Sequence, residues 1–174
     1  MNDHNPIQYL MQEHEVITGT MPLVNRLDRL WETDPAQYEQ SIRYLLDFYR
    51  AYADRYHHRK EEDILFEALR ELPDFTLDEI IDELESHHES FRERIQGIDA
   101  ALDESRFQEA QGRLSEYLGL LLDHIAIEDD ELFVMAENLF KEQDLENMYF
   151  RFLDSDAELG MKDKQDLVNR LDQL

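Results

Sequence analysis

The sequence of 174 residues contains no cysteine, and this absence excludes several kinds of chemistry. Disulfide bonds, thiolate nucleophiles, zinc ribbons and iron–sulfur clusters all require cysteine. Glycine and proline are also scarce, at 5 and 4 residues. Because both residues interrupt helices, their scarcity favours helix nearly everywhere and argues against a sheet.

Long apolar runs are missing as well, and positive charge is scarce. No apolar run approaches the roughly 20 residues that span a membrane, and the polar start Met1–His4 is unlike a signal peptide, so we expect a cytoplasmic protein. Only 17 Lys and Arg stand against 42 Asp and Glu, which gives a formal net charge of −25. Such a surface should repel nucleic acid and anionic membranes, so neither is an expected partner.

What the sequence does contain is a series of apolar stripes with helical spacing. Pro73 should end the second helix, and Gly19 and Pro22 should kink the first. Short connections between long helices imply antiparallel neighbours. We therefore predict an all-α fold, an antiparallel up-down-up-down four-helix bundle over residues 1–140. The expected helix starts are Asn5-Pro6, Asp34-Pro35, the capping box Thr76–Glu79 and the cap Ser105.

Residues 141–174 form a C-terminal extension beyond the four helices. Apolar residues at 145–153 predict one more amphipathic helix, which Gly160 should end, and residues 165–174 predict another short helix. We expect the extension to pack along the bundle. The alternative is that it forms the interface of a homodimer.

Two segments of the sequence repeat one another at an offset of 67 residues. Residues 57–66 read HHRKEEDILF and residues 124–133 read HIAIEDDELF, so both fit H-x-x-x-E-[ED]-D-x-L-F. Residues four apart share one face of a helix, so each histidine and its glutamate can reach one metal ion, or one ion and its neighbour. A carboxylate can bridge two ions, whereas an imidazole suits a terminal position. This donor set favours iron, manganese or zinc.

The other two bundle helices each place a histidine in an apolar stripe, His14 in the first and His88 in the third. A single histidine on such a face is usually a hydrogen-bonded core residue. Four of them with two glutamates are different, because buried carboxylates without partners are too costly to keep ionised, and a pair of metal ions removes that cost. The predicted metal ligands are His14, His57, Glu61, His88, His124 and Glu128.

These motifs resemble those of the hemerythrin HHE cation-binding family over about residues 5–140. PIQYLMQEHEVI at residues 6–17 resembles the family's opening helix, and YHHRKEEDILF at residues 56–66 is close to its most specific motif. SHHESFR at residues 86–92 resembles the third-helix motif, and residues 124–133 match the last one. The resemblance implies two iron ions joined by an oxo or hydroxo bridge. It implies four histidines as terminal ligands and Glu61 and Glu128 as bridges.

Two histidine doublets leave a choice of ligand. The repeat selects His57 over His58, and the third-helix motif selects His88 over His87. Glu62, four residues after His58, is a further candidate.

The sequence also departs from the family's oxygen carriers at two places. Arg92 stands where the carriers have a second histidine on the third helix, and His124 with Glu128 stands where they have a histidine-x4-aspartate pattern. The resemblance therefore implies one nitrogen ligand fewer than in a carrier, and a site that is more open to exogenous ligands and redox chemistry.

From the resemblance we expect a non-haem di-iron protein that binds or reacts with O2, peroxide or nitric oxide, in oxidative or nitrosative stress handling. Whether this makes the protein an enzyme is left open. One alternative is an iron- or oxygen-sensing module that acts through a partner protein. Another is a metal-free scaffold with an acidic helical surface.

Overall fold

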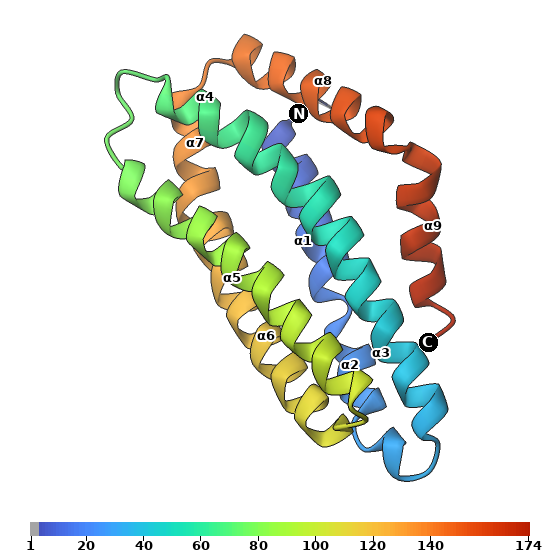
Figure 1. The fold of residues 1–174 in the computed structure, drawn as a ribbon. Helices are drawn as coiled ribbons and strands as arrows, with labels where there is room; N and C mark the ends of the chain where they lie inside the picture. Colours follow the sequence, from blue (N-terminus) through green and yellow to red (C-terminus); the bar gives the residue numbers. More distant parts are fainter. Residues whose placement is uncertain (1–3) are drawn as a thin grey trace.

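The computed structural model describes residues 4–174, and every element in that range is helical. The predicted fold class, a hemerythrin-like bundle followed by C-terminal helices, is confirmed (Figure 1). Residues 1–3, the first part of the polar start, lie outside the described residues. Within residues 4–174, no helix combines the length and the apolar character that crossing a membrane requires.

The first bundle helix is divided into α1 (Pro6–Thr18) and α2 (Met21–Leu27). As predicted, Asn5 caps α1, because its side chain accepts hydrogen bonds from the amides of Ile7 and Gln8. The kink expected from Gly19 and Pro22 is a complete break. Gly19 ends α1, and Pro22 lies in the first turn of α2, where its missing N–H needs no partner.

The second bundle helix runs without interruption from Pro35 to Arg70, but its winding changes along the way. It begins as α3 (Pro35–Phe48), capped by Asp34, and ends as α4 (Glu67–Arg70). Between these lie two π-helical segments, η2 (Tyr49–His58) and η3 (Glu61–Phe66). A π-helix has i→i+5 hydrogen bonds and therefore a wider turn than an α-helix.

The third and fourth bundle helices pack against each other as an antiparallel pair. The third is α5 (Asp78–Asp103); the fourth is α6 (Phe107–Ile127), the π-helical η4 (Glu128–Leu132) and α7 (Phe133–Leu139). The helix predicted at the capping box begins inside that segment, at Asp78, although Leu77 before it makes no side-chain capping bond. The predicted cap at Ser105 is wrong, because Ser105 lies at φ 55° and its amide donates to the Leu102 carbonyl at 2.9 Å. Ser105 thus closes the end of α5 instead of capping α6.

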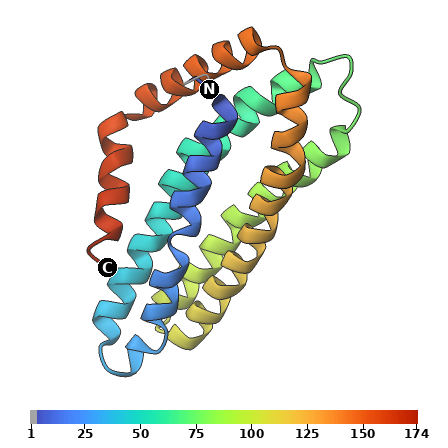
Figure 2. The ribbon, with the colours of Figure 1, turned by 180° about the vertical axis from the view of Figure 1, so that it is seen from behind.

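The C-terminal extension consists of α8 (Glu142–Leu159) and α9 (Met161–Leu171). Gly160 separates them at φ 104°, as predicted, and α9 begins four residues earlier than expected. Helix α8 crosses outside α1, and α9 runs back beside η2 and α3, as the two opposite views show (Figures 1 and 2). The Tyr56 hydroxyl donates to the carbonyls of Leu159 and Gly160 and so ties this corner to the bundle.

Two apolar clusters fill the molecule, and buried polar side chains lie between them. On α1, Leu10 belongs to one cluster and Ile17 to the other, with His14 between them. The same change of cluster occurs around His88 on α5 and around Glu128 on η4. The fold therefore positions a polar layer in the middle of the bundle, closed from water by apolar packing above and below.

Candidate metal centre

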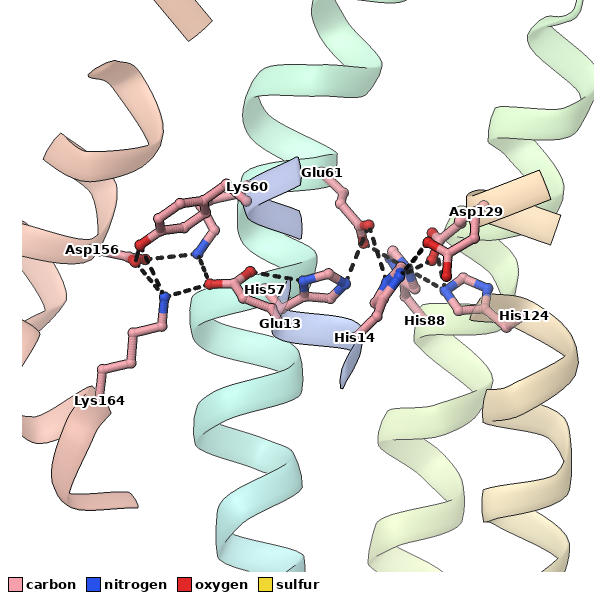
Figure 3. Close-up of polar contacts among 12 residues, drawn as sticks. Glu13, His14, His57, Lys60, Glu61, His88, His124, Asp129, Asp156 and Lys164 are labelled. Atoms are coloured by element: carbon pink, nitrogen blue, oxygen red, sulfur yellow. Dashed lines mark hydrogen bonds and ion pairs between the residues drawn. The ribbon is translucent and has the colours of Figure 1, made fainter. Parts of the chain in front are cut away.

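The structure brings all six predicted ligands, together with His58, into one buried layer. Figure 3 labels five of them, His14, His57, Glu61, His88 and His124. They form two groups of four residues, and within each group the potential ligand atoms lie within 4.8 Å of one another. The first group is His14, His57, Glu61 and Glu128; the second is His58, Glu61, His88 and His124. None of these seven residues is more than 2% exposed. We call this set the polar layer.

Glu61 and Glu128 stand between the two groups. Glu61 Oε1 lies 3.3 Å from His57 Nε2, while its Oε2 lies 3.6 Å from His88 Nε2. Glu128 Oε2 lies 3.3 Å from His14 Nε2, while its Oε1 lies 3.2 Å from His124 Nε2. Each carboxylate therefore faces one group with one oxygen and the other group with the second. This is the arrangement that bridging two cations requires.

The polar layer also contains buried atoms with no hydrogen-bond partner. They include both carboxylate oxygens of Glu61 and of Glu128, and Nε2 of His14. Leaving such groups unsatisfied in a protein interior costs free energy, and nearly all buried polar groups in native proteins have a partner. In addition, His88 Nε2 and His124 Nε2 lie only 3.0 Å apart. Lone pairs converging from several sides are satisfied by a cation, so the residues present fit a metal pair.

Carboxylates outside the layer hold three of the histidines by the opposite ring nitrogen. His14 Nδ1 donates to Asp129 at 2.8 Å, His57 Nδ1 to Glu13 at 2.9 Å, and His88 Nδ1 to Glu62 at 2.7 Å. A proton fixed on Nδ1 leaves the Nε2 lone pair free for a metal, as is usual for metal-binding histidines.

The electrostatics of His14 reflect the same crowding of carboxylates. Burial lowers the pKa of His14, but the hydrogen bond to Asp129 and the nearby negative charge of Glu128 outweigh burial and raise that pKa to about 10. Positive charge is thus favoured at this position. When no metal is bound, a proton on the His14 ring supplies it.

Glu62 and His87, the other candidates at the doublets, lie outside both groups. Glu62 accepts hydrogen bonds from His88 and from Arg92, the latter at 2.8 Å. Glu62 therefore accepts a hydrogen bond from the His88 nitrogen that points away from the layer, and Arg92 keeps Glu62 in this position. The His87 side chain is 35% exposed.

His58 is the ligand candidate that the sequence reasoning passed over. In an α-helix, neighbouring side chains point in different directions, so one member of a doublet should face outward. Here the doublet ends the wider-turned η2, and His57 and His58 are both buried in the layer. The doublet itself was the available signal, but it also occurs in α5, where only one member is buried.

The fifth histidine changes the expected ligand count. The His58 ring stacks on that of His88, with centroids 3.8 Å apart, and burial lowers its pKa well below the usual value. It is therefore neutral, as a metal ligand must be. The expectation of one nitrogen ligand fewer than in an oxygen carrier counted four histidines, whereas five line the layer. Which of the five bind metal stays a prediction.

A cavity of about 270 Å³ reaches the layer from the side. His58 and His88 form its inner wall, and Phe91, Arg92 and Tyr117 are among its other lining residues. Its volume lies just below the range of pockets for drug-sized molecules and is ample for ligands of a few atoms.

One protein-family model matches most of this chain. The sequence model of the hemerythrin HHE cation-binding domain matches residues 5–136. No curated protein and no solved structure gives a match. The matched range ends inside α7, so α8 and α9 lie beyond it.

Proposed function

This chain belongs to the family of hemerythrin HHE cation-binding domains, and from that premise we propose that it is a non-haem di-iron protein that binds or reacts with O2, peroxide or nitric oxide. The observation that carries the proposal is the pair of buried carboxylates, Glu61 and Glu128, each of which faces two groups of imidazole donors without a hydrogen-bond partner of its own.

The polar layer divides naturally between two ions. His14 and His57 would hold one ion, and His58, His88 and His124 would hold the other. Glu61 and Glu128 would lie between them. The choice of iron follows the likeness to hemerythrins; manganese and zinc are the other ions that this donor set suits.

An iron pair, when bound, supplies Lewis acidity and a store of electrons. The chain's own contribution is to position and protect. The two apolar clusters keep bulk water from the layer. The cavity beside His58 and His88 has room for a molecule of the size of O2, peroxide or nitric oxide. We propose a role in oxidative or nitrosative stress handling on this basis.

Absorption spectroscopy of the iron-loaded protein tests the proposal. We expect charge-transfer bands of a ferric pair in the oxidised protein. After reduction without oxygen, separate additions of O2, peroxide and nitric oxide should each be followed, and at least one should change the spectrum in proportion to the iron content. The Glu61→Ala Glu128→Ala double variant is the matched control and should show neither bands nor changes. An iron-loaded wild-type protein that responds to none of the three ligands would contradict the proposal.

A second candidate function is an iron- or oxygen-sensing module that acts through a protein partner. Its support is the position of the extension, since α8 and α9 lie against α1 and η2, the elements that carry His14 and His57. Metal occupancy could then alter a surface that a partner binds. If removal of iron leaves both helicity and melting temperature unchanged, this candidate fails.

A further inference from the structure

A second group of buried charges lies beside the polar layer and contributes no ligand to it. Its members are two carboxylates and two ammonium groups, and none of the four residues is more than 9% exposed. We call it the four-charge cluster: Glu13, Lys60, Asp156 and Lys164. Glu13 and Lys60 belong to the bundle, whereas Asp156 lies on α8 and Lys164 on α9 (Figure 3).

The four groups form a closed ring of ion pairs. Lys60 Nζ donates to Glu13 Oε1 and to Asp156 Oδ1, each at 2.7 Å. Lys164 Nζ donates to the same two carboxylates. The Tyr9 hydroxyl completes the surroundings of Asp156 with a hydrogen bond of 2.5 Å. Each ammonium thus joins the bundle to the extension.

The ring connects to the polar layer through one atom. Glu13 Oε2, the oxygen that neither lysine occupies, accepts the hydrogen bond from His57 Nδ1 at 2.9 Å. The carboxylates behind His14 and His88 differ, because the Asp129 and Glu62 side chains are each 27% exposed and belong to the bundle. Among the three histidine–carboxylate pairs described above, the pair of His57 and Glu13 is the one whose carboxylate is held by residues outside the bundle.

Stability alone does not account for such a cluster. Replacing buried ion pairs by apolar side chains of similar volume is often neutral or stabilising, because the desolvation of the charges costs so much. The Lys164 ammonium is also held over three aromatic rings, those of Tyr9, Tyr52 and Tyr56, at 4.9, 5.6 and 5.6 Å from their centroids. The position of Lys164 is therefore fixed closely.

We propose that Lys164 and Asp156 are positioning residues of the metal centre, which fix Glu13 so that His57 keeps Nε2 directed at Glu61. The inference rests on the proposed function in that the polar layer must bind metal. The inference goes beyond the proposed function because it gives the C-terminal extension, which lies outside the matched domain, a role in holding a metal ligand in position. The extension then acts on metal retention through one carboxylate.

A double-mutant cycle on the full-length protein tests this inference. The variants are Lys164→Met, which removes the charge but keeps the stem, Glu13→Gln, and the two combined. Lys162→Met, at an exposed position of the same helix, is the control. Each protein is loaded with Fe(II) without oxygen, and the rate of iron release to an excess of a coloured chelator is measured, together with the melting temperature of the metal-free form.

We expect Glu13→Gln and Lys164→Met each to speed iron release by ~10-fold, the size typical of lost support behind a metal ligand. The combined variant should release iron no faster than Glu13→Gln alone, because Lys164 acts through Glu13. The control should match the wild type. Should Lys164→Met not fold, the charge-balanced pair Lys164→Met Asp156→Asn, which leaves Lys60 paired with Glu13, takes its place in the cycle.

Two results would overturn the inference while leaving the proposed function intact. One is that the change at Lys164 speeds release by the same factor with and without Glu13. The other is that it lowers the melting temperature of the metal-free protein and leaves iron release unchanged, which is the result of a purely structural role. A wild-type protein that takes up no iron would overturn both proposals together.

Discussion

At the scale of single residues, histidines of the polar layer use their two ring nitrogens differently: one points into the layer, and the other donates a hydrogen bond to a carboxylate outside it. In His57, one nitrogen is turned to Glu61 and the other donates to Glu13. His88 repeats the pattern with Glu61 and Glu62. Such pairing fixes the tautomer and the ring plane before any metal arrives, which reduces the ordering that binding must otherwise supply.

Glu13 gives a pH prediction at this scale. Burial raises its pKa, but the hydrogen bond from His57 and the charge of Lys60 outweigh burial and lower that pKa to about 2, from 4.5. A group with a depressed folded-state pKa stabilises the fold above its unfolded value and loses that contribution as pH falls toward the folded value. The free energy of unfolding of the metal-free protein should therefore decline between pH 4.5 and 2.

Denaturant titrations of the metal-free protein at a series of pH values measure this contribution. The wild type shares its other carboxylates with Glu13→Gln, so the difference between the two curves isolates Glu13. We expect the difference to shrink as pH falls through the window from 4.5 to 2. Parallel curves would mean that Glu13 does not contribute in this way.

The residue patterns in the sequence predicted most of this site but not all of it. The six predicted ligands stand at helical spacings on apolar faces, which one sequence displays directly. The carboxylates behind the histidines could not be predicted in the same way. Glu13 is one of 42 acidic residues, and only the packing of α1 against η2 and α9 gives it its role.

At the scale of elements, the π-helical segments coincide with the polar layer. His57 and His58 end η2, Glu61 begins η3 and Glu128 begins η4. A π-helical turn re-aims side chains relative to the α-helix before it, and such turns are frequent at functional sites. The π-helical turns thus determine which side chains point into the polar layer.

His58 provides the element-scale prediction. Because η2 brings His58 into the second group, His58→Ala should weaken binding of the second ion and leave the first in place. The matched control is His4→Ala, which changes the same residue type outside both groups, where the His4 ring contacts Tyr149 and Phe150 on α8. Metal titration followed by calorimetry should show one tight site in His58→Ala and two in His4→Ala. Two undisturbed sites in His58→Ala would exclude it as a ligand.

Helix positions were predictable where a rigid local signal marks them. Asn5 and Asp34, each followed by proline, cap helices as expected. The capping box at residues 76–79 marks the start of α5 at Asp78 but supplies no side-chain cap, and no periodicity in the sequence distinguishes the π-helical turns from the α-helix around them. Winding of this kind depends on tertiary packing and on the site itself.

At the scale of the whole molecule, the polar layer separates two apolar clusters and joins all four bundle helices. Without a cation, the layer holds unsatisfied carboxylate oxygens at the centre of the fold. A ligand that binds only the folded state adds to its stability by mass action. Metal binding and folding should therefore be closely coupled.

Thermal unfolding measures this coupling. Removing iron with a chelator should lower the melting temperature by on the order of 10 °C, since a few kcal/mol of lost binding energy moves a domain of this size by that amount. Restoring iron should restore the melting temperature. The Glu61→Ala Glu128→Ala variant should melt at one temperature with or without iron. A wild-type melting temperature that ignores iron would contradict the coupling.

The C-terminal extension and the surface charge are also properties of the whole molecule. Helices α8 and α9 lie against the bundle and bury Asp156 and Lys164 there. A homodimer through the same extension stays a prediction. So does the absence of nucleic-acid and membrane partners, which rests on a net charge of −25.

The most direct test of the account is a count of metal ions per chain, made by elemental analysis of the full-length protein after loading with iron and removal of the unbound excess. We predict about two iron ions per wild-type chain, as in other carboxylate-bridged di-iron bundles, and close to none in the Glu61→Ala Glu128→Ala variant. A wild-type chain that retains no iron, or a double variant that retains as much as the wild type, would contradict the claim that these two carboxylates lie between two iron ions.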